Sequence, residues 1–163
     1  MKTLLLLRHA KSSWKDSDLE DHERPLNKRG KRDAPRMGQL LLDEHLIPDL
    51  IFSSSAKRTR RTAELVIEAC DYRGETRLLR DCYEATAGQL LECIQKFPES
   101  ASRVLLVGHN PGLEELLEKL TGTYHPLSTA ALAWLEIPAE TWSEINQETR
   151  AELKHLWQPR ELE

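Results

Sequence analysis

The chain has 163 residues, 39% of them hydrophobic, and its 23 basic and 27 acidic residues give a formal net charge of −4. A chain of this length can bury one substantial core, so we expect a single domain over residues 1–163. The acidic balance argues against nonspecific binding to nucleic acid or to an anionic membrane, because both need a positive excess.

No apolar stretch approaches the roughly 20 residues that cross a bilayer, and the leucine run at residues 4–7 is too short for a secretory signal. The three cysteines are an odd number without the spacing of metal ligands, which suits reduced thiols that pack in the interior. We therefore expect a cytoplasmic protein.

The first half of the chain alternates predicted strands and helices. The continuous apolar run at residues 3–7 is typical of a strand covered on both faces by helices. Residues 11–25 form the longest segment without a pattern, and a loop of that length is often functional. A helix is predicted after Asn27, a good N-cap, and Pro35 is expected to kink it or to start a second helix capped by Asp33. The apolar residues expected in its buried stripe are Met37, Leu40, Leu41 and Leu42.

The same alternation continues to residue 121. Weaker strands are predicted at residues 50–53 and 76–79, each followed by a helical pattern, at residues 56–70 and 86–95. A second strong strand at residues 104–107 precedes a helix with Asn110 as cap and Pro111 at its first position. Strands near residues 130–137 and 151–157 complete the pattern. It predicts an α/β fold, a three-layer α/β/α sandwich with a mostly parallel central sheet.

Both strong strands end in histidine, at His9 in "LLLLRH" and at His109 in "VLLVGH". Ligands of open parallel sheets collect outside the carboxyl ends of the strands, so both imidazoles are expected at one edge of the sheet. A single histidine after a strand is more often structural than functional. Two histidines in matching positions make a functional role about as well supported as a structural one.

The segment "SSSAKRTRRTAE" follows a third predicted strand and brings four cations, including Arg58, to the start of a helix. A helix N-terminus and guanidinium groups both favour an anion, and together with Arg8 they predict a phosphate site. Cations on a helix point in different directions, so only one or two can face the site, and the spacing does not select among them. A metal site built from His9, His109 and carboxylates is the alternative, which the neighbouring cations oppose. No Walker-type glycine loop is present, which disfavours nucleotide-driven transfer.

Five segments in order, "LLLLRHAKSSW", "RPLNKRG", "SSSAKRTRRTAE", "YEATAGQLL" and "VLLVGHNPGLEELL", resemble the histidine phosphatase superfamily and its small SixA-like phosphohistidine phosphatases. The resemblance covers nearly the whole chain. It implies a phosphoglycerate-mutase-like fold and a phosphatase that needs no metal and no cofactor.

The resemblance also implies roles for individual residues. His9 corresponds to the nucleophile that accepts the phosphoryl group, and Arg8, Arg58 and His109 correspond to the groups that bind phosphate. Glu84 stands where the family allows a general acid. Asp81 is a second choice, and a surface carboxylate without a catalytic role is an equal alternative.

The short chain favours an open pocket and therefore phosphohistidine on a protein as substrate, rather than mutase activity. The alternatives are a phosphomonoesterase that acts on a small phosphorylated metabolite and a phosphate-recognition module without turnover. The sequence departs from the family at Ala10, because the superfamily usually has glycine after Arg-His and a methyl group narrows the approach of phosphate to the backbone.

Overall fold

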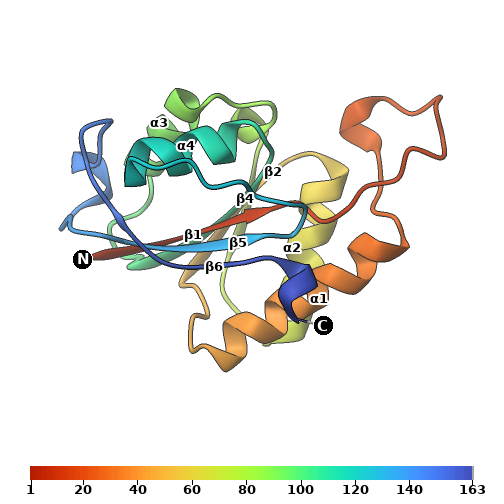
Figure 1. The fold of residues 1–163 in the computed structure, drawn as a ribbon, viewed down its shortest axis with the longest axis horizontal. Helices are drawn as coiled ribbons and strands as arrows, with labels where there is room; N and C mark the ends of the chain where they lie inside the picture. Colours follow the sequence, from red (N-terminus) through yellow and green to blue (C-terminus); the bar gives the residue numbers. More distant parts are fainter. Residues whose placement is uncertain (163) are drawn as a thin grey trace.

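A computed structural model describes residues 1–162 and contains one six-stranded sheet in the order β3-β2-β4-β1-β5-β6 (Figure 1). Its strands are β1 (Lys2–Arg8), β2 (Leu50–Ser54), β3 (Thr76–Leu79), β4 (Arg103–Gly108), β5 (Leu132–Ile137) and β6 (Glu152–Trp157). The α-helices are α1 (Lys28–Asp43), α2 (Lys57–Cys70), α3 (Ala87–Gln95) and α4 (Gly112–Thr121). Short 3-10 helices are η1 (Asp21–Glu23), η2 (Arg80–Cys82), η3 (Trp142–Glu144) and η4 (Pro159–Leu162).

The sheet is mostly parallel, as the sequence predicts. Strand β1 pairs in parallel with β4, and β2 pairs in parallel with both β4 and β3. Strand β5 runs antiparallel to β1, and β6 runs antiparallel to β5 at the edge of the sheet. The four parallel strands therefore direct their carboxyl ends to one edge.

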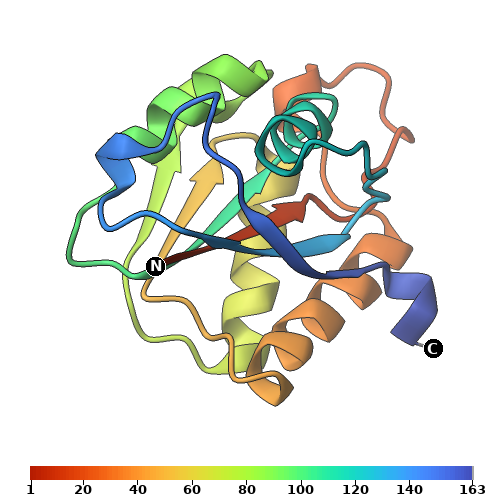
Figure 2. The same cartoon turned by 60° about the vertical axis from the view of Figure 1, so that its left-hand side comes forward.

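Helices cover both faces of the sheet, with α1 and α2 below it and α3 and α4 above it in Figure 2. Leu5 and Leu7 of β1 pack in the hydrophobic cluster between the sheet and helices α1 and α2. Leu4 and Leu6 pack in the cluster between the sheet and helices α3 and α4. Because both faces are covered, every leucine of the run is fully buried and the strand needs no polar alternation. In residues 1–162, no helix combines the length and the apolarity that a membrane span requires.

The prediction that Pro35 starts a second helix capped by Asp33 is wrong. Pro35 lies inside the continuous helix α1, and Asp33 does not cap a second helix. The Asn27 side chain accepts a hydrogen bond from the Gly30 N–H and caps the whole helix. Asp33 is buried and forms ion pairs with arginines of its own helix, at 3.5 Å from Arg29 among others, so its carboxylate is not available to cap.

Three smaller differences follow from tertiary contacts. Leu42 is 39% exposed and does not belong to the buried stripe of α1. Asn110 does not cap α4: the N-cap position is Pro111, one residue later, and the Asn110 side-chain amide donates to Glu114 and to the Leu127 carbonyl. The segment 11–25 is not patternless, since it contains η1 and its Ser12 pairs with Leu26 in an isolated bridge.

Candidate active site

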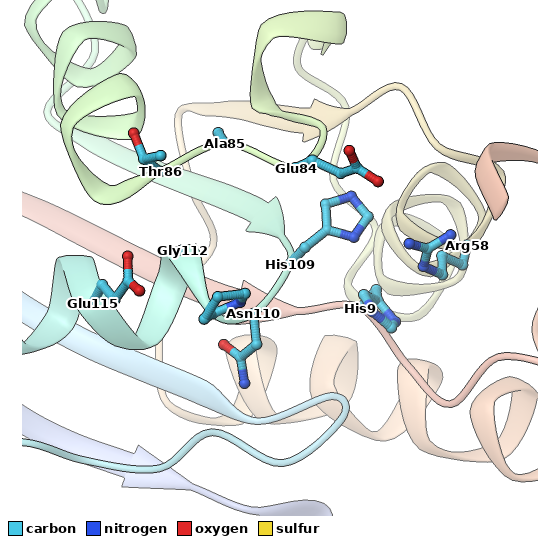
Figure 3. A pocket seen from close by; sticks show the side chains of 10 residues that line it. His9, Arg58, Glu84, Ala85, Thr86, His109, Asn110, Gly112 and Glu115 are labelled. Atoms are coloured by element: carbon cyan, nitrogen blue, oxygen red, sulfur yellow. The ribbon is translucent and has the colours of Figure 1, made fainter.

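The carboxyl ends of the parallel strands form one wall of a pocket of about 400 Å³ (Figure 3). His9 directly follows β1, His109 directly follows β4, and Arg58 is the second residue of α2. In Figure 3 these three side chains gather with Glu84 at one end of the pocket, and Glu115 lies at the other end. The residues that line the pocket are His9, Arg58, Glu84, Ala85, Thr86, His109, Asn110, Pro111, Gly112 and Glu115.

One nitrogen of His9 is committed to the backbone. The side chain is buried, and its Nδ1 lies 2.8 Å from the Ala10 carbonyl oxygen. A carbonyl oxygen only accepts, so Nδ1 carries the proton and Nε2 keeps its lone pair in the neutral ring. Burial lowers the pKa of His9 to about 4, and the charges of Arg58 and Arg8 act in the same direction. His9 is therefore neutral at pH 7, with Nε2 as its free nitrogen.

His109 is held beside His9, with the two ring centroids 5.2 Å apart. Its Nε2 lies 2.7 Å from the Ser54 hydroxyl at the end of β2. Burial, with the neighbouring His9 and Arg58 acting in the same direction, lowers the pKa of His109 to about 3. Two neutral imidazoles thus stand next to a guanidinium group.

Arg58 alone among the four cations of its segment is buried, and it is held by Asp21 of η1. Its Nη1 donates to the Asp21 carbonyl oxygen at 2.7 Å, and its Nη2 donates to the Asp21 carboxylate at 3.0 Å. The same carboxylate accepts from Arg24 and from the Tyr83 hydroxyl. These three donors, in the order Tyr83, Arg24 and Arg58, hold the pKa of Asp21 well below its usual range against partial burial.

The sequence reasoning missed Asp21 and Tyr83. Asp21 is one of several acidic residues in the segment 11–25, and nothing in the sequence singles it out. It reaches the site only because that segment folds over the start of α2. The Tyr83 ring packs edge-on against His109, with centroids 5.4 Å apart. Tyr83 therefore contacts both the histidine wall of the pocket and the carboxylate that holds Arg58.

Arg8 is not among the residues that line the pocket. Its Nη1 donates to the Leu127 carbonyl oxygen at 3.0 Å, while its Nε is buried without a hydrogen-bond partner within residues 1–162. A buried donor without a partner is costly, which is consistent with a site that completes its hydrogen bonds with an anion. Its charge also lowers the pKa of both histidines.

The two predicted acid candidates separate. Glu84 is exposed, lines the pocket and has a φ of 54°, in the left-handed region that is unfavourable for a non-glycine residue. Asp81 lines a different surface hollow, which Glu84 also lines. Of the two, only Glu84 lies in the same pocket as His9.

The methyl group of Ala10 does not face the pocket. Ala10 is fully buried in the cluster with Leu5 and Leu7, and its N–H donates to the Thr62 hydroxyl at 3.0 Å. Its φ is not positive, so the backbone does not require glycine there. The structure therefore gives no sign that this methyl group restricts the pocket.

The arrangement suits a tetrahedral anion with several oxygens. Guanidinium groups and imidazole N–H donors match such oxygens, and His9, whose Nε2 keeps a free lone pair, lines the same pocket. The Ser54 contact uses one nitrogen of His109, and its Nδ1 makes no hydrogen bond to residues 1–162. Nδ1 beside His9 is thus left open to a ligand, and it is a donor when the Ser54 hydroxyl donates to Nε2.

Comparisons with known proteins agree with this chemistry. A sequence model of the histidine phosphatase superfamily, branch 1, matches residues 4–105. An uncharacterized chloroplastic protein of Arabidopsis thaliana is 36% identical over 152 residues, which cover 88% of this chain and 70% of that protein.

Solved structures resemble the chain over nearly its whole length. The crystal structure of a candidate phosphohistidine phosphatase SixA from Agrobacterium tumefaciens has a TM-score of 0.83 and 29% identity, covering 96% of this chain and 97% of that one. The structure of a candidate α-ribazole-5′-phosphate phosphatase from Escherichia coli has a TM-score of 0.70 at 17% identity, covering 98% of each chain, and shows a shared fold. The predicted three-layer, phosphoglycerate-mutase-like fold is confirmed.

Proposed function

Since the chain belongs to the histidine phosphatase superfamily and is a phosphatase, we propose that it removes phosphate from phosphohistidine on a protein, through a phosphohistidine intermediate on His9. The observation that carries the proposal is the single free nitrogen of His9. With Nδ1–H bonded to the Ala10 carbonyl oxygen and the ring neutral, Nε2 is the one nitrogen that can attack.

In the first step His9 Nε2 attacks the phosphorus atom in line with the leaving group. The bond between phosphorus and the leaving group breaks as the new N–P bond forms. Arg58 and Arg8 supply positive charge at the phosphoryl oxygens, and His109 donates a hydrogen bond from Nδ1. Water then attacks the phosphorus, and the N–P bond breaks as the new O–P bond forms. Both protons of the water leave with the inorganic phosphate, and His9 returns to its neutral form with the lone pair on Nε2.

The leaving group distinguishes the possible substrates. The imidazole of phosphohistidine departs as a neutral ring once it is protonated, so it makes little demand on a general acid. An alkoxide from a phosphate ester is far more basic and needs a proton. Glu84 lies in the pocket where it can supply that proton, and this favours a phosphomonoesterase of small metabolites as a second candidate function. The E. coli neighbour, a candidate phosphatase of a small phosphate ester, supports the same alternative.

Phosphoryl labelling tests the nucleophile. Rapid quenching after mixing with a ³²P-labelled phosphodonor is expected to leave acid-labile, alkali-stable label on the wild-type protein and none on His9→Ala. His125→Ala changes a histidine outside the pocket and is the matched control, which should label like wild type. Undiminished label on His9→Ala would overturn the assignment.

A side-by-side assay tests the substrate. We expect kcat/KM for a phosphohistidine-bearing protein to exceed that for each of a panel of small phosphate esters. Glu84→Gln is expected to lower ester hydrolysis by about 100-fold, the lower end of the range for loss of a general acid, and to leave phosphohistidine hydrolysis nearly unchanged. If an ester is the better substrate and Glu84→Gln abolishes its turnover, the second candidate replaces the first.

A further inference from the structure

Two of the three thiols lie beside each other, next to the catalytic pocket but not in it. The Sγ atoms of Cys82, at the end of η2, and Cys93, in α3, are 3.7 Å apart, and both residues are free thiols. Cys70, the third thiol, packs in the cluster on the opposite face of the sheet. The fold therefore brings together two cysteines that are 11 positions apart in the sequence and leaves the third alone.

The paired thiols differ in access to solvent. Cys82 is 1% exposed, whereas Cys93 is half-buried and lines a surface hollow of about 420 Å³. Tyr83 and Glu84 line the same hollow. A small reagent can thus reach Cys93 from solvent, and Cys82 is the buried partner behind it.

They also differ in acidity. The Cys82 thiol donates to the Cys93 sulfur, and this hydrogen bond lowers the pKa of Cys93 below that of an ordinary thiol, with help from Lys96. Burial and the carboxylates of Asp81 and Glu92 oppose the shift without cancelling it. Thiolates are the form that reacts with peroxides, so the accessible thiol is also the more reactive of the two.

We propose that Cys82 and Cys93 form an oxidation site, at which hydrogen peroxide joins the two thiols in a disulfide. The Cys93 thiolate attacks one peroxide oxygen, which gives a sulfenic acid and releases hydroxide. The Cys82 sulfur then attacks the sulfenic sulfur, and the S–S bond forms as the S–O bond breaks. The leaving oxygen takes the Cys82 proton and departs as water, so two thiols are oxidised and one peroxide is reduced.

The disulfide changes the catalytic pocket, an effect that rests on the proposed function. Disulfide sulfurs are about 2.05 Å apart, so Cys82 and Cys93 must approach each other by roughly 1.7 Å. Tyr83 directly follows Cys82 and donates to the carboxylate of Asp21, which holds Arg58. Movement of Cys82 therefore reaches the phosphate-binding arginine through two contacts, and oxidation lowers activity.

Thiol counting tests the site without reference to activity. The folded protein is treated with hydrogen peroxide, and its remaining thiols are alkylated after denaturation. We expect free thiols to fall from three to one, with Cys70 alkylated, and a peptide that joins Cys82 to Cys93 in mass spectra. Cys82→Ser should instead hold a sulfenic acid on Cys93 that dimedone traps, and Cys70→Ser should form the disulfide like wild type. Three alkylated thiols, or oxidised Cys93 without the linked peptide, would overturn the proposal.

Activity of the same samples tests the consequence. Oxidised wild type is expected to lose roughly tenfold in kcat/KM, since a displacement of about 1 Å at a catalytic site lowers rates by up to about 100-fold, and dithiothreitol should restore it. Cys93→Ser should keep its activity in peroxide, because the reactive thiol is absent. A linked peptide with unchanged activity would refute the effect on the pocket. If reduced protein hydrolyses no phosphorylated substrate at all, the proposed function fails while the thiol count still decides the oxidation site.

Discussion

The Nδ1–H of His9 donates to the carbonyl oxygen of the next residue, and this one contact determines which nitrogen is free. The acceptor is a backbone carbonyl, so this contact does not depend on which side chain stands at position 10. The methyl group of Ala10 is buried and does not line the pocket. Arg58 differs, because its position depends on another side chain. The carboxylate of Asp21 accepts from it and from two further donors.

We predict that Asp21→Asn raises KM for phosphorylated substrate about fivefold with a smaller change in kcat. The substitution removes the charge that holds Arg58 and keeps the size of the side chain. A hydrogen bond to a charged group contributes roughly 1.5 to 3 kcal/mol, and because the Asp21 side chain is 43% exposed we reduce this to about 1 kcal/mol, or about fivefold. Steady-state kinetics beside Asp18→Asn, a change in the same loop, would check it. Equal kcat/KM for the two variants would contradict a positioning role for Asp21.

The residues at the ends of the strands could be predicted from sequence, whereas the residues that hold them could not. His9 and His109 follow continuous apolar runs, and strand direction alone sends both to one edge. Arg58 could not be separated from its neighbours by helical spacing, because the selection comes from η1 folding over α2. Asp21 could not be singled out within the segment 11–25, since its contacts join segments up to 62 residues apart.

At the scale of elements, helices α1 and α2 depend on a small residue where they meet. A Cβ on Gly38 would lie 2.5 Å from the Val66 carbonyl oxygen and 2.7 Å from the Ala69 Cβ. We predict that Gly38→Ala lowers the free energy of unfolding by about 2 kcal/mol, because overpacking outweighs the gain in helix propensity. Gly88→Ala in α3 is the control, since its nearest heavy atom would be 3.9 Å away, and it should be neutral or slightly stabilising. Urea denaturation measures both, and a Gly38→Ala variant as stable as wild type would show that the helices separate at no cost.

The helices were predictable where a local signal agreed with packing. The helix predicted at residues 86–95 is α3, and the structure adds a Thr86 cap with a reciprocal contact to Gln89. The prediction of a second helix starting at Pro35 failed because the missing N–H of proline weakens a helix only locally. The packing of α1 against α2 and the Asn27 cap stabilise α1 as a whole. The prediction for Asn110 failed because the helix starts one residue later, with Pro111 at the N-cap position, and the Asn110 amide contacts Glu114 and the Leu127 carbonyl instead.

At the scale of the molecule, the order of the strands brings the site together. Alternation of strands and helices predicted a parallel sheet, but it did not predict that β1 lies directly between β4 and β5. That adjacency places His9 beside His109, and it buries two imidazoles in a site that also holds cations. The burial that keeps His9 nucleophilic at neutral pH therefore affects the stability of the whole fold.

We predict that the protein loses stability as the pH falls from about 6.5 towards 4, before its carboxylates titrate. The folded-state pKa values of His9 and His109 are lowered to about 4 and about 3 from the ordinary 6.5, so below pH 6.5 the unfolded chain binds protons that the folded chain does not. Each histidine then contributes up to roughly 1.4 kcal/mol of lost stability per pH unit. Urea denaturation between pH 7.5 and 5 should show the decline, and His109→Gln, whose amide can still bond Ser54, should reduce its slope by about half. Stability that is flat over this range would mean that the two rings are not held neutral by the fold, and the free Nε2 of His9 would then need another explanation.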